Sequence, residues 1–196
     1  MKVYLDDSDL SEILRYLGYR GGELDEKTKD DISECIRIIN DCAEARMVWR
    51  LFALQDLEGV LTLRDTYVKL PGESIRKHLN GASEAVLLAV TLGSALDGEV
   101  NRLMVTNPAK GVVLNACGVA LVEKAADALQ SEIDEKLNGP KTGVRFSPGF
   151  GDLPLSLQED FIALLDTERK IGVRLNPNML MNPTKSITAI AAVIKE

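Results

Sequence analysis

The sequence has few of the side chains that most enzymes use for their chemistry. His78 is the only histidine, and it lies in a segment predicted to form a surface helix, which does not favour a nucleophile–histidine–acid triad. The three cysteines, Cys35, Cys42 and Cys117, are too dispersed to form a zinc site with one histidine. No glycine fingerprint for a dinucleotide and no P-loop is present. We therefore expect no catalytic residue and no metal site, and a partner or a cofactor to supply any chemistry.

The chain also lacks a basic stripe and a long hydrophobic run. It carries 23 Lys and Arg against 30 Asp and Glu, and its formal net charge of −7 disfavours binding to nucleic acid or to an anionic membrane. The residues after Met1 contain no apolar run typical of a signal peptide. No stretch approaches the roughly 18 apolar residues that a membrane span needs. The cysteines, odd in number and without a C-x-x-C pair, are typical of reduced, buried thiols. Together these features predict a cytoplasmic protein with no nucleic-acid partner and no membrane partner.

What is present is the composition of an ordinary globular protein. The chain has 196 residues, of which 45% are hydrophobic and 27% charged, enough for one domain with a real core. No internal repeat, low-complexity segment or linker divides it. Residues 1–196 are therefore interpreted as a single domain.

Helical periodicity and short apolar runs predict where the helices and strands of the chain lie. Apolar residues at helical spacing predict helices over residues 10–17, 25–46, 71–78, 94–106, 110–137 and 155–168, with Ser94 as a capping residue. Runs of strand-forming residues predict strands over residues 47–54, 60–63, 67–70, 84–92, 172–175 and 187–194. The most apolar runs, 84–92 and 187–194, are expected inside the sheet, and 60–63 with 67–70 as a hairpin. The predicted fold class is α+β, with helices packed on a mostly antiparallel or mixed twisted sheet.

Two acidic residues on the longest predicted helix allow more than one interpretation. Glu123 and Asp127 are four residues apart and share one helix face. They could form an acid–base couple or ligate a hard cation. A solvated helix face beside Lys124 explains the same spacing, and this is the interpretation that we favour.

The stretch from Arg145 to Asp152 is the strongest candidate for a ligand site. Its sequence, Arg-Phe-Ser-Pro-Gly-Phe-Gly-Asp, combines a type II turn signature at Pro148-Gly149 with a second glycine, Gly151, where a ligand can approach the backbone. The planar guanidinium of Arg145 suits a carboxylate or a phosphate, and two phenylalanine rings offer flat apolar faces. These residues could line a site for a small, zwitterionic, heterocyclic ligand. A plain turn, with the arginine in a surface ion pair, remains the alternative.

Several segments together resemble one known family. Arg-Phe-Ser-Pro-Gly-Phe, residues 145–150, is similar to the Arg-x-x-Pro-Gly-Tyr motif of the activation domain of cobalamin-dependent methionine synthase, which binds S-adenosylmethionine. The N-terminal residues 13–21 and the longer motif through Asp152 resemble stand-alone relatives of that domain. Val90-Thr-Leu-Gly93 is similar to the end of the family's central strand. Residues 168–175, followed by Met181-Asn-Pro183 and Ser186, resemble its Glu-x-x-x-Gly-x-x-Leu … Met-x-Pro … Ser pattern.

The resemblance implies a function in repairing a cofactor that another protein carries. In the family, the activation domain binds S-adenosylmethionine and supports reductive methylation of inactive cob(II)alamin, with an electron from a flavodoxin-like or ferredoxin-like reductant. It implies here a stand-alone reactivation subunit, whose partner is a cobalamin-binding methionine synthase or another corrinoid protein. The alternative is a docking or scaffold protein for a corrinoid protein that has lost the ligand. The residues implied to bind S-adenosylmethionine are Arg145, Phe146, Ser147, Pro148, Gly149, Phe150, Gly151 and Asp152, with Arg145 holding the carboxylate.

Three positions depart from the family pattern. The motif tyrosine is replaced by Phe150, which keeps the ring and loses the hydroxyl. Gly18 best matches an acidic residue near the N-terminus that helps to hold the ligand in the fused enzymes, and Asp152 is a candidate replacement for that acid. An aromatic cluster after the Met-x-Pro-x-x-Ser segment is replaced by Thr188-Ala-Ile-Ala-Ala192.

Overall fold

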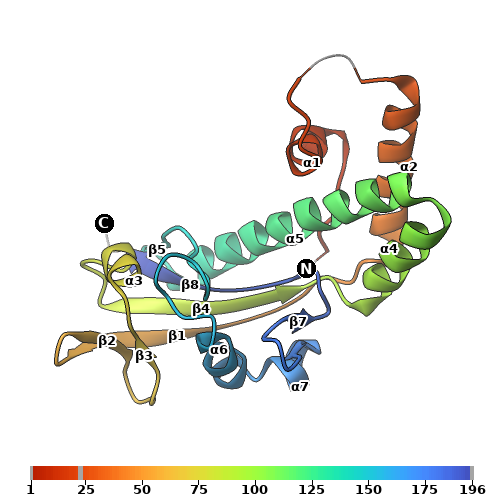
Figure 1. Cartoon of the computed structure of the whole chain (residues 1–196). Coiled ribbons are helices and arrows are strands. Elements are labelled where there is room, and N and C mark those ends of the chain that lie inside the picture. The colour runs from red at the N-terminus through yellow and green to blue at the C-terminus, as the bar shows by residue number, and fades with distance from the viewer. Residues whose placement is uncertain (1, 22–23, 195–196) are drawn as a thin grey trace.

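Groups of helices and groups of strands follow one another along the chain that the structure describes. The computed structural model describes residues 2–21 and 24–194 (Figure 1). Its helices are the 3-10 helix η1 (Asp7–Asp9) and the α-helices α1 (Leu10–Tyr16), α2 (Glu26–Cys42), α3 (Glu73–His78), α4 (Ser94–Thr106), α5 (Pro108–Leu137), α6 (Leu157–Leu165) and α7 (Thr167–Ile171). Its strands are β1 (Arg46–Leu57), β2 (Val60–Leu63), β3 (Lys69–Leu70), β4 (Glu84–Thr91), β5 (Lys141–Thr142), β6 (Arg174–Leu175), β7 (Met181–Asn182) and β8 (Ser186–Ile194).

A six-stranded sheet organises the molecule. Its strand order is β3-β2-β1-β4-β8-β5, and every strand pair in it is antiparallel. The hairpin β6–β7 forms a separate two-stranded sheet. The most apolar strand, β4, lies between β1 and β8, and its side chains from Ala85 to Val90 are fully buried. The α+β class, the antiparallel sheet, the hairpin β2–β3 and the interior position of strands 84–92 and 187–194 are thereby confirmed.

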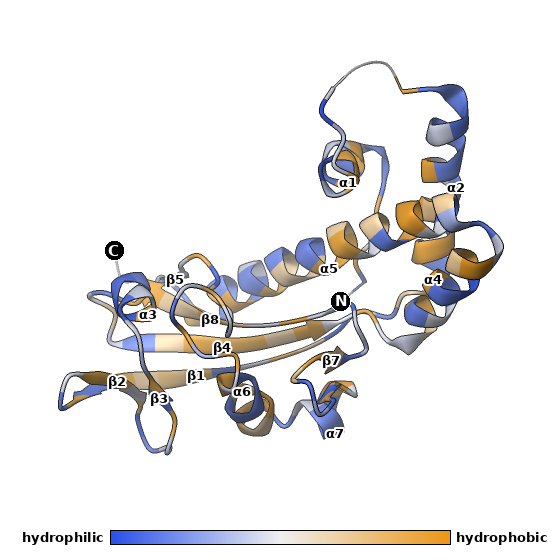
Figure 2. Ribbon diagram, viewed as in Figure 1, coloured by the Kyte–Doolittle hydropathy of each residue, from blue (hydrophilic) through white to orange (hydrophobic). Residues whose placement is uncertain are grey.

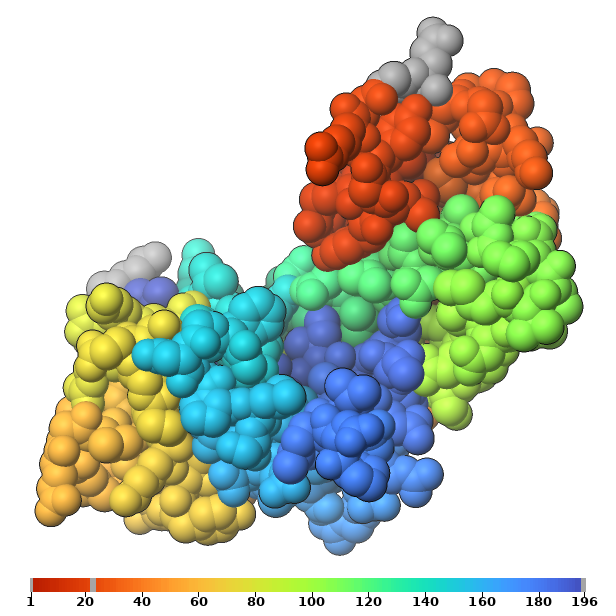
Figure 3. All heavy atoms as spheres, in the orientation of Figure 1, coloured from red at the N-terminus to blue at the C-terminus, as the bar shows by residue number. Residues whose placement is uncertain are grey.

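The two faces of the sheet carry two hydrophobic clusters. Alternate residues of β4 point to opposite faces, so that Val86 and Leu88 pack with α2, α4 and α5, while Leu87 packs with α3, α6 and α7. Figure 1 shows α5 running along one side of the sheet, with α6 and α7 on the other. Hydrophobic residues gather where α5 passes α2 and α4 (Figure 2). The N-terminal helices α1 and α2 project from the body of the molecule (Figure 3).

Some predicted boundaries were wrong. The predicted helix over residues 155–168 is two helices, because Asp166 adopts a left-handed conformation with φ of 53° between α6 and α7. The predicted helix over residues 25–46 ends at Cys42, and β1 begins at Arg46. Ser94 is the first residue of α4 and not its cap, a position that Gly93 occupies.

The cysteines are free thiols, and two of them are buried. Burial raises the pKa of Cys35 to about 11 and that of Cys117 to about 12, so both are neutral at physiological pH. None of the described helices is both long enough and apolar enough to cross a membrane.

Candidate functional site

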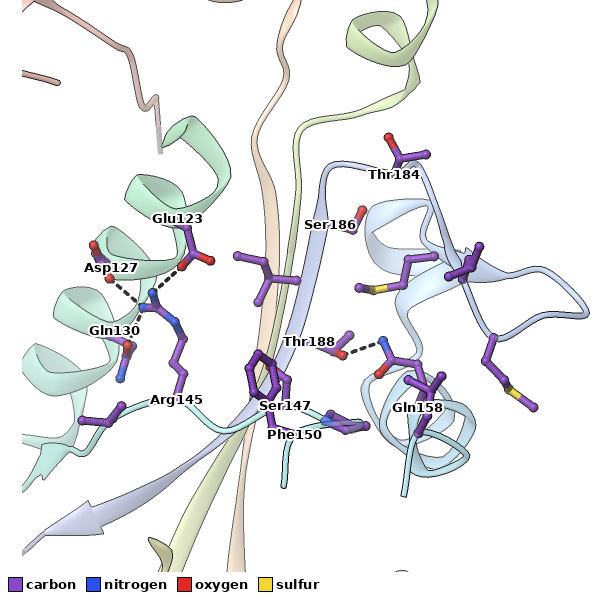
Figure 4. A pocket seen from close by; sticks show the side chains of 17 residues that line it. Glu123, Asp127, Gln130, Arg145, Ser147, Phe150, Gln158, Thr184, Ser186 and Thr188 are labelled. Carbon is purple, nitrogen blue, oxygen red and sulfur yellow. Dashed lines mark hydrogen bonds and ion pairs between the residues drawn. The ribbon is translucent and has the colours of Figure 1, made fainter. Parts of the chain in front are cut away.

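A cavity opens beside β8, where the Arg145–Asp152 stretch passes it. The cavity has a volume of about 810 Å³, within the range of sites that hold small molecules. Its walls come from α5, from the segment after β5, from α6 and from the residues between β6 and β8 (Figure 4). In the space-filling view the surface is hollowed between these segments (Figure 3). The lining residues are Glu123, Asp127, Gln130, Val144, Arg145, Ser147, Pro148, Phe150, Leu155, Gln158, Met179, Leu180, Met181, Thr184, Ser186, Ile187 and Thr188.

Arg145 forms one end of the cavity. Its guanidinium donates to Glu123 at 2.8 Å, to Asp127 at 2.7 Å and to Gln130 at 2.6 Å, and all three acceptors lie on α5 (Figure 4). The side chain is 17% exposed, which limits competition from water. A guanidinium has five N–H donors. Two of them, on Nε and Nη2, have no partner among the described residues and are free to bind a ligand.

The acidic pair on α5 is part of this charged end. The interpretation of Glu123 and Asp127 as a solvated helix face was incomplete: the side chains are 42% and 72% exposed, but both carboxylates also accept hydrogen bonds from Arg145. Sequence spacing could not show this, since the arginine follows 22 and 18 residues later on another segment. One cation thus faces two carboxylates, which leaves this end of the cavity with an excess of negative charge.

The same three charged residues also border a second, smaller cavity. It has a volume of about 350 Å³ and lies between α1 and α5. Asp9 and Glu12 of the N-terminal segment line it, together with Lys124, which binds Asp9 at 2.7 Å. Gly18, the position matched to an acidic ligand-binding residue, lines neither cavity.

The Pro-Gly segment forms the predicted turn. The N–H of Phe150 donates to the carbonyl of Ser147 at 3.1 Å, and Gly149 has a φ of 91°, as a type II turn requires at its third position. Ser147, Pro148 and Phe150 line the cavity, and the ring of Phe150 is 63% exposed at its rim. Gly149 sets the turn without lining the cavity.

The other residues of the predicted site face the short helix α3 instead of the cavity. The Asp152 carboxylate accepts from the backbone N–H groups of Glu73 at 2.7 Å and Ser74 at 3.0 Å. These two hydrogen bonds, that of Ser74 first, lower the pKa of Asp152. Gly151 lies so close to Ser74 that an added Cβ would come within 2.7 Å of its hydroxyl oxygen. Asp152 is therefore engaged in holding α3 and does not stand at the cavity in place of a ligand-binding acid.

Phe146 also packs toward α3. Its ring lies 4.9 Å from that of His78 and 6.3 Å from that of Phe150, measured between ring centres. His78 contacts the carbonyl of Val144 through Nε2 at 2.6 Å. Because successive residues of an extended segment point to opposite sides, Arg145 reaches α5 while Phe146 reaches α3.

The end of the cavity opposite Arg145 is neutral and was not predicted as a site. Gln158 on α6 donates from Nε2 to the Thr188 hydroxyl on β8 at 2.7 Å (Figure 4). Both residues are buried, 4% and 2% exposed, and both line the cavity. One sequence signal was available, since each is a polar residue at an inward-facing position of its element.

Comparison with solved structures shows which fold this is. No protein family model matches the sequence, and no curated protein matches it. The solved MetH reactivation domain bound to AdoHcy is similar, with a TM-score of 0.65 and 16% sequence identity. The match covers 94% of this chain and 73% of that chain. The chain thus has the fold of the MetH reactivation domain, which confirms the fold expected from the activation-domain resemblance.

Proposed function

We propose that this chain binds S-adenosylmethionine in the cavity and presents it for reactivation of a cobalamin-dependent methyltransferase, methionine synthase or a related corrinoid enzyme. The observation that carries the proposal is the two-ended cavity, charged at Arg145 and neutral at Gln158. S-adenosylmethionine has the same division, with an amino-acid group and a sulfonium at one end and a neutral purine at the other. In this proposal residues 1–196 act as one activation-domain-like unit.

The charged end suits the amino-acid part of the ligand. The two unpaired N–H donors of Arg145 would take the carboxylate, a charge-assisted contact. Glu123 and Asp127 keep lone pairs toward the cavity for the ammonium group, and their negative charge favours the sulfonium. Arg145 is already fixed by three acceptors, so little side-chain entropy is lost when the ligand binds.

This chain would orient the ligand, and the partner would supply the reactive metal. Cobalamin on the partner, reduced by one electron from a flavodoxin-like or ferredoxin-like protein, would supply the nucleophile for the methyl group, and S-adenosylhomocysteine would be the product that remains from the ligand. Methyl transfer from a sulfonium needs no proton transfer, so this chain needs only to hold the ligand with its methyl group accessible. The open cavity rim at Phe150 and Leu180, both largely exposed, leaves room for such access.

The fold supports the same proposal. The similar MetH reactivation domain was solved with AdoHcy, the methyl-free form of S-adenosylmethionine. Two of the segments that carry the sequence resemblance, residues 145–150 and 181–186, both contribute to the cavity walls.

Titration calorimetry with S-adenosylmethionine and S-adenosylhomocysteine tests binding directly. We expect saturable binding of both. A protein that gives no heat at millimolar ligand, alone and with a corrinoid protein, would instead be the docking or scaffold protein of the alternative.

A reconstituted assay tests the activation step. Methyl-labelled S-adenosylmethionine, a reductant and a cob(II)alamin-loaded methionine synthase that lacks its own reactivation domain are mixed with and without this chain. We expect label on cobalamin only when the chain is present. Binding without label transfer would retain the ligand and remove methionine synthase as the partner.

A further inference from the structure

At the neutral end of the cavity, one edge of β8 has main-chain groups that are not hydrogen-bonded within the sheet. Ile190 of β8 exchanges both of its main-chain hydrogen bonds with Phe146, each at 2.8 Å. In an antiparallel strand alternate residues present their main-chain groups to the same side, so the N–H and C=O of Thr188 face this same edge. Phe146 and Ile190 form an isolated bridge, and the same antiparallel register, extended by two residues on each segment, would set Pro148 opposite Thr188.

Proline explains why the ladder ends at this point. Pro148 has no N–H and cannot donate to the Thr188 carbonyl. It also begins the turn that carries residues 148–151 away from β8. Both residues line the cavity. The main-chain N–H and C=O of Thr188 therefore have no main-chain partner among the described residues, and they face the cavity.

The side chain of Gln158 adds a third unpaired group. Its Nε2 is used by the Thr188 hydroxyl, which fixes the plane of the amide. No described residue donates to its Oε1 atom, although the residue is only 4% exposed and lines the cavity. Among the described residues the fully buried side-chain polar atom without a partner is Arg46 Nε, so Gln158 Oε1 is not sealed inside the protein, and it is accessible to a ligand donor from the cavity.

These three groups define what a ligand must offer. Two carbonyl oxygens, one from Thr188 and one from Gln158, accept hydrogen bonds, and one N–H lies beside them and donates. The amine edge of adenine matches this set, because its exocyclic amine has two donors and the adjacent ring nitrogen accepts. Hypoxanthine, with an oxo group in place of the amine and an N–H in place of the ring acceptor, would place acceptor against acceptor and donor against donor.

We propose that the Thr188 main chain and the Gln158 side chain form the subsite that selects a 6-aminopurine over a 6-oxopurine. The proposal rests on the proposed function, since it takes the ligand to be an adenosyl compound, and assigns Gln158 as a specificity-determining residue.

The test compares two ligands that differ only in the base. Binding of S-adenosylhomocysteine and of S-inosylhomocysteine is measured by calorimetry on the parent protein, on Gln158→Leu and on Gln55→Leu, a control on β1 away from the cavity. We expect the parent and the control to favour the adenine compound by at least about tenfold, the effect of one well-formed hydrogen bond. Gln158→Leu should reduce this preference to about threefold or less.

The outcomes separate this inference from the proposed function. Equal binding of both ligands by the parent protein, or an unchanged preference in a folded Gln158→Leu protein, would overturn the subsite and leave the function standing. If neither ligand binds the parent protein, both are wrong. Thr188→Val serves as a second variant if Gln158→Leu does not fold, because it keeps the main chain, frees the Gln158 amide and should weaken the preference in the same direction.

Discussion

Arg145 has one observed role, binding α5, and one proposed role, binding the ligand, and a single substitution can separate them. It binds three side chains of α5 and keeps two donors for a ligand. Arg145→Ala should lower the affinity for S-adenosylmethionine about ten- to a hundredfold, the value of a charge-assisted contact. Its effect on the melting temperature should be small, because Glu123 and Asp127 are 42% and 72% exposed and become hydrated when the arginine is removed. Calorimetry and thermal unfolding of the same variant measure the two effects.

A surface arginine on another helix provides the control. Arg102 pairs with Glu99 on α4, outside both cavities, and Arg102→Ala should change neither quantity appreciably. Arg145→Lys keeps the charge without the planar fork, and we expect it to bind more weakly than the parent protein. An Arg145→Ala protein with parental affinity would remove the main reason for placing the ligand here.

At the scale of residues, the sequence predicts what local backbone chemistry determines. The turn at Pro148-Gly149 was predictable because proline fixes φ and glycine accepts a positive φ. The partners of Glu123 and Asp127 were not, because pairing across elements depends on how α5 lies against the next segment. The assignment of Asp152 to ligand binding fails in geometric terms for the same reason. Its carboxylate oxygens accept hydrogen bonds from residues of α3 that lie 79 and 78 positions earlier in the chain.

At the scale of elements, α3 acts as a clamp on the segment that we propose binds the ligand. Asp152 holds its first turn, and His78 at its end holds the carbonyl of Val144. Gly72 permits the close approach, because a Cβ there would lie 2.5 Å from an Asp152 oxygen. The two contacts bracket the segment that aims Arg145, so a six-residue helix outside the cavity controls its geometry.

The Asp152 end of the clamp should depend on pH. Asp152→Ala should lower the melting temperature at pH 7, because two backbone N–H groups of α3 lose their acceptor. The hydrogen bonds lower the pKa of Asp152 below its ordinary value of 3.8, so the stabilisation is complete above that value and is lost as the pH falls through the lowered pKa. Thermal unfolding from pH 7 downward should therefore show the parent and the variant converging only below about pH 3.8.

An exposed aspartate without such contacts serves for comparison. Asp30→Ala, on α2, should unfold like the parent protein throughout this range. A constant difference between the parent protein and Asp152→Ala, persisting into strong acid, would show that the charge of Asp152 is not what holds α3.

The His78 end of the clamp should affect ligand binding. A carbonyl can only accept, so Nε2 of His78 carries the proton that it donates to Val144. His78→Ala removes this bond and the ring contact to Phe146, and should weaken S-adenosylhomocysteine binding several-fold by loosening the segment that carries Arg145. Lys77→Ala, the exposed neighbour on the same helix, is the control. Equal affinities for the two variants would mean that α3 contributes only stability.

Element prediction succeeded wherever periodicity was long and failed at interruptions. The apolar runs of β4 and β8 and the length of α5 were evident, because burial on a sheet or against several helices leaves a continuous pattern. The break at Asp166 was not, because the surrounding residues follow a helical pattern and the break is evident only in the tertiary arrangement, where α6 and α7 pack on the sheet as two helices. Gln158 and Thr188, 30 residues apart, form one subsite only through that tertiary arrangement.

At the scale of the whole molecule, charge should distinguish the ligand before and after methyl transfer. S-adenosylmethionine carries one net positive charge at neutral pH, and S-adenosylhomocysteine carries none. The protein has a formal net charge of −7, and two carboxylates against one guanidinium border the cavity. Added salt should therefore weaken binding of S-adenosylmethionine more than binding of S-adenosylhomocysteine, because it screens an attraction that only the cation feels.

Calorimetry at low and high sodium chloride measures this difference. Glu123→Gln should reduce it, whereas Glu132→Gln, a half-buried position on the same helix outside the cavities, should leave it unchanged. Identical salt dependence for the two ligands would show that the carboxylates beside Arg145 do not attract the sulfonium electrostatically.

The position of β8 also has a consequence during synthesis on the ribosome. Every residue that lines the larger cavity lies between Glu123 and Thr188, and its floor belongs to the last strand of the sheet. Until β8 emerges, one edge of the apolar strand β4 is unpaired and prone to aggregation. Ligand binding therefore cannot protect the nascent chain from aggregation before β8 has emerged, because the strand that completes the sheet also completes the cavity.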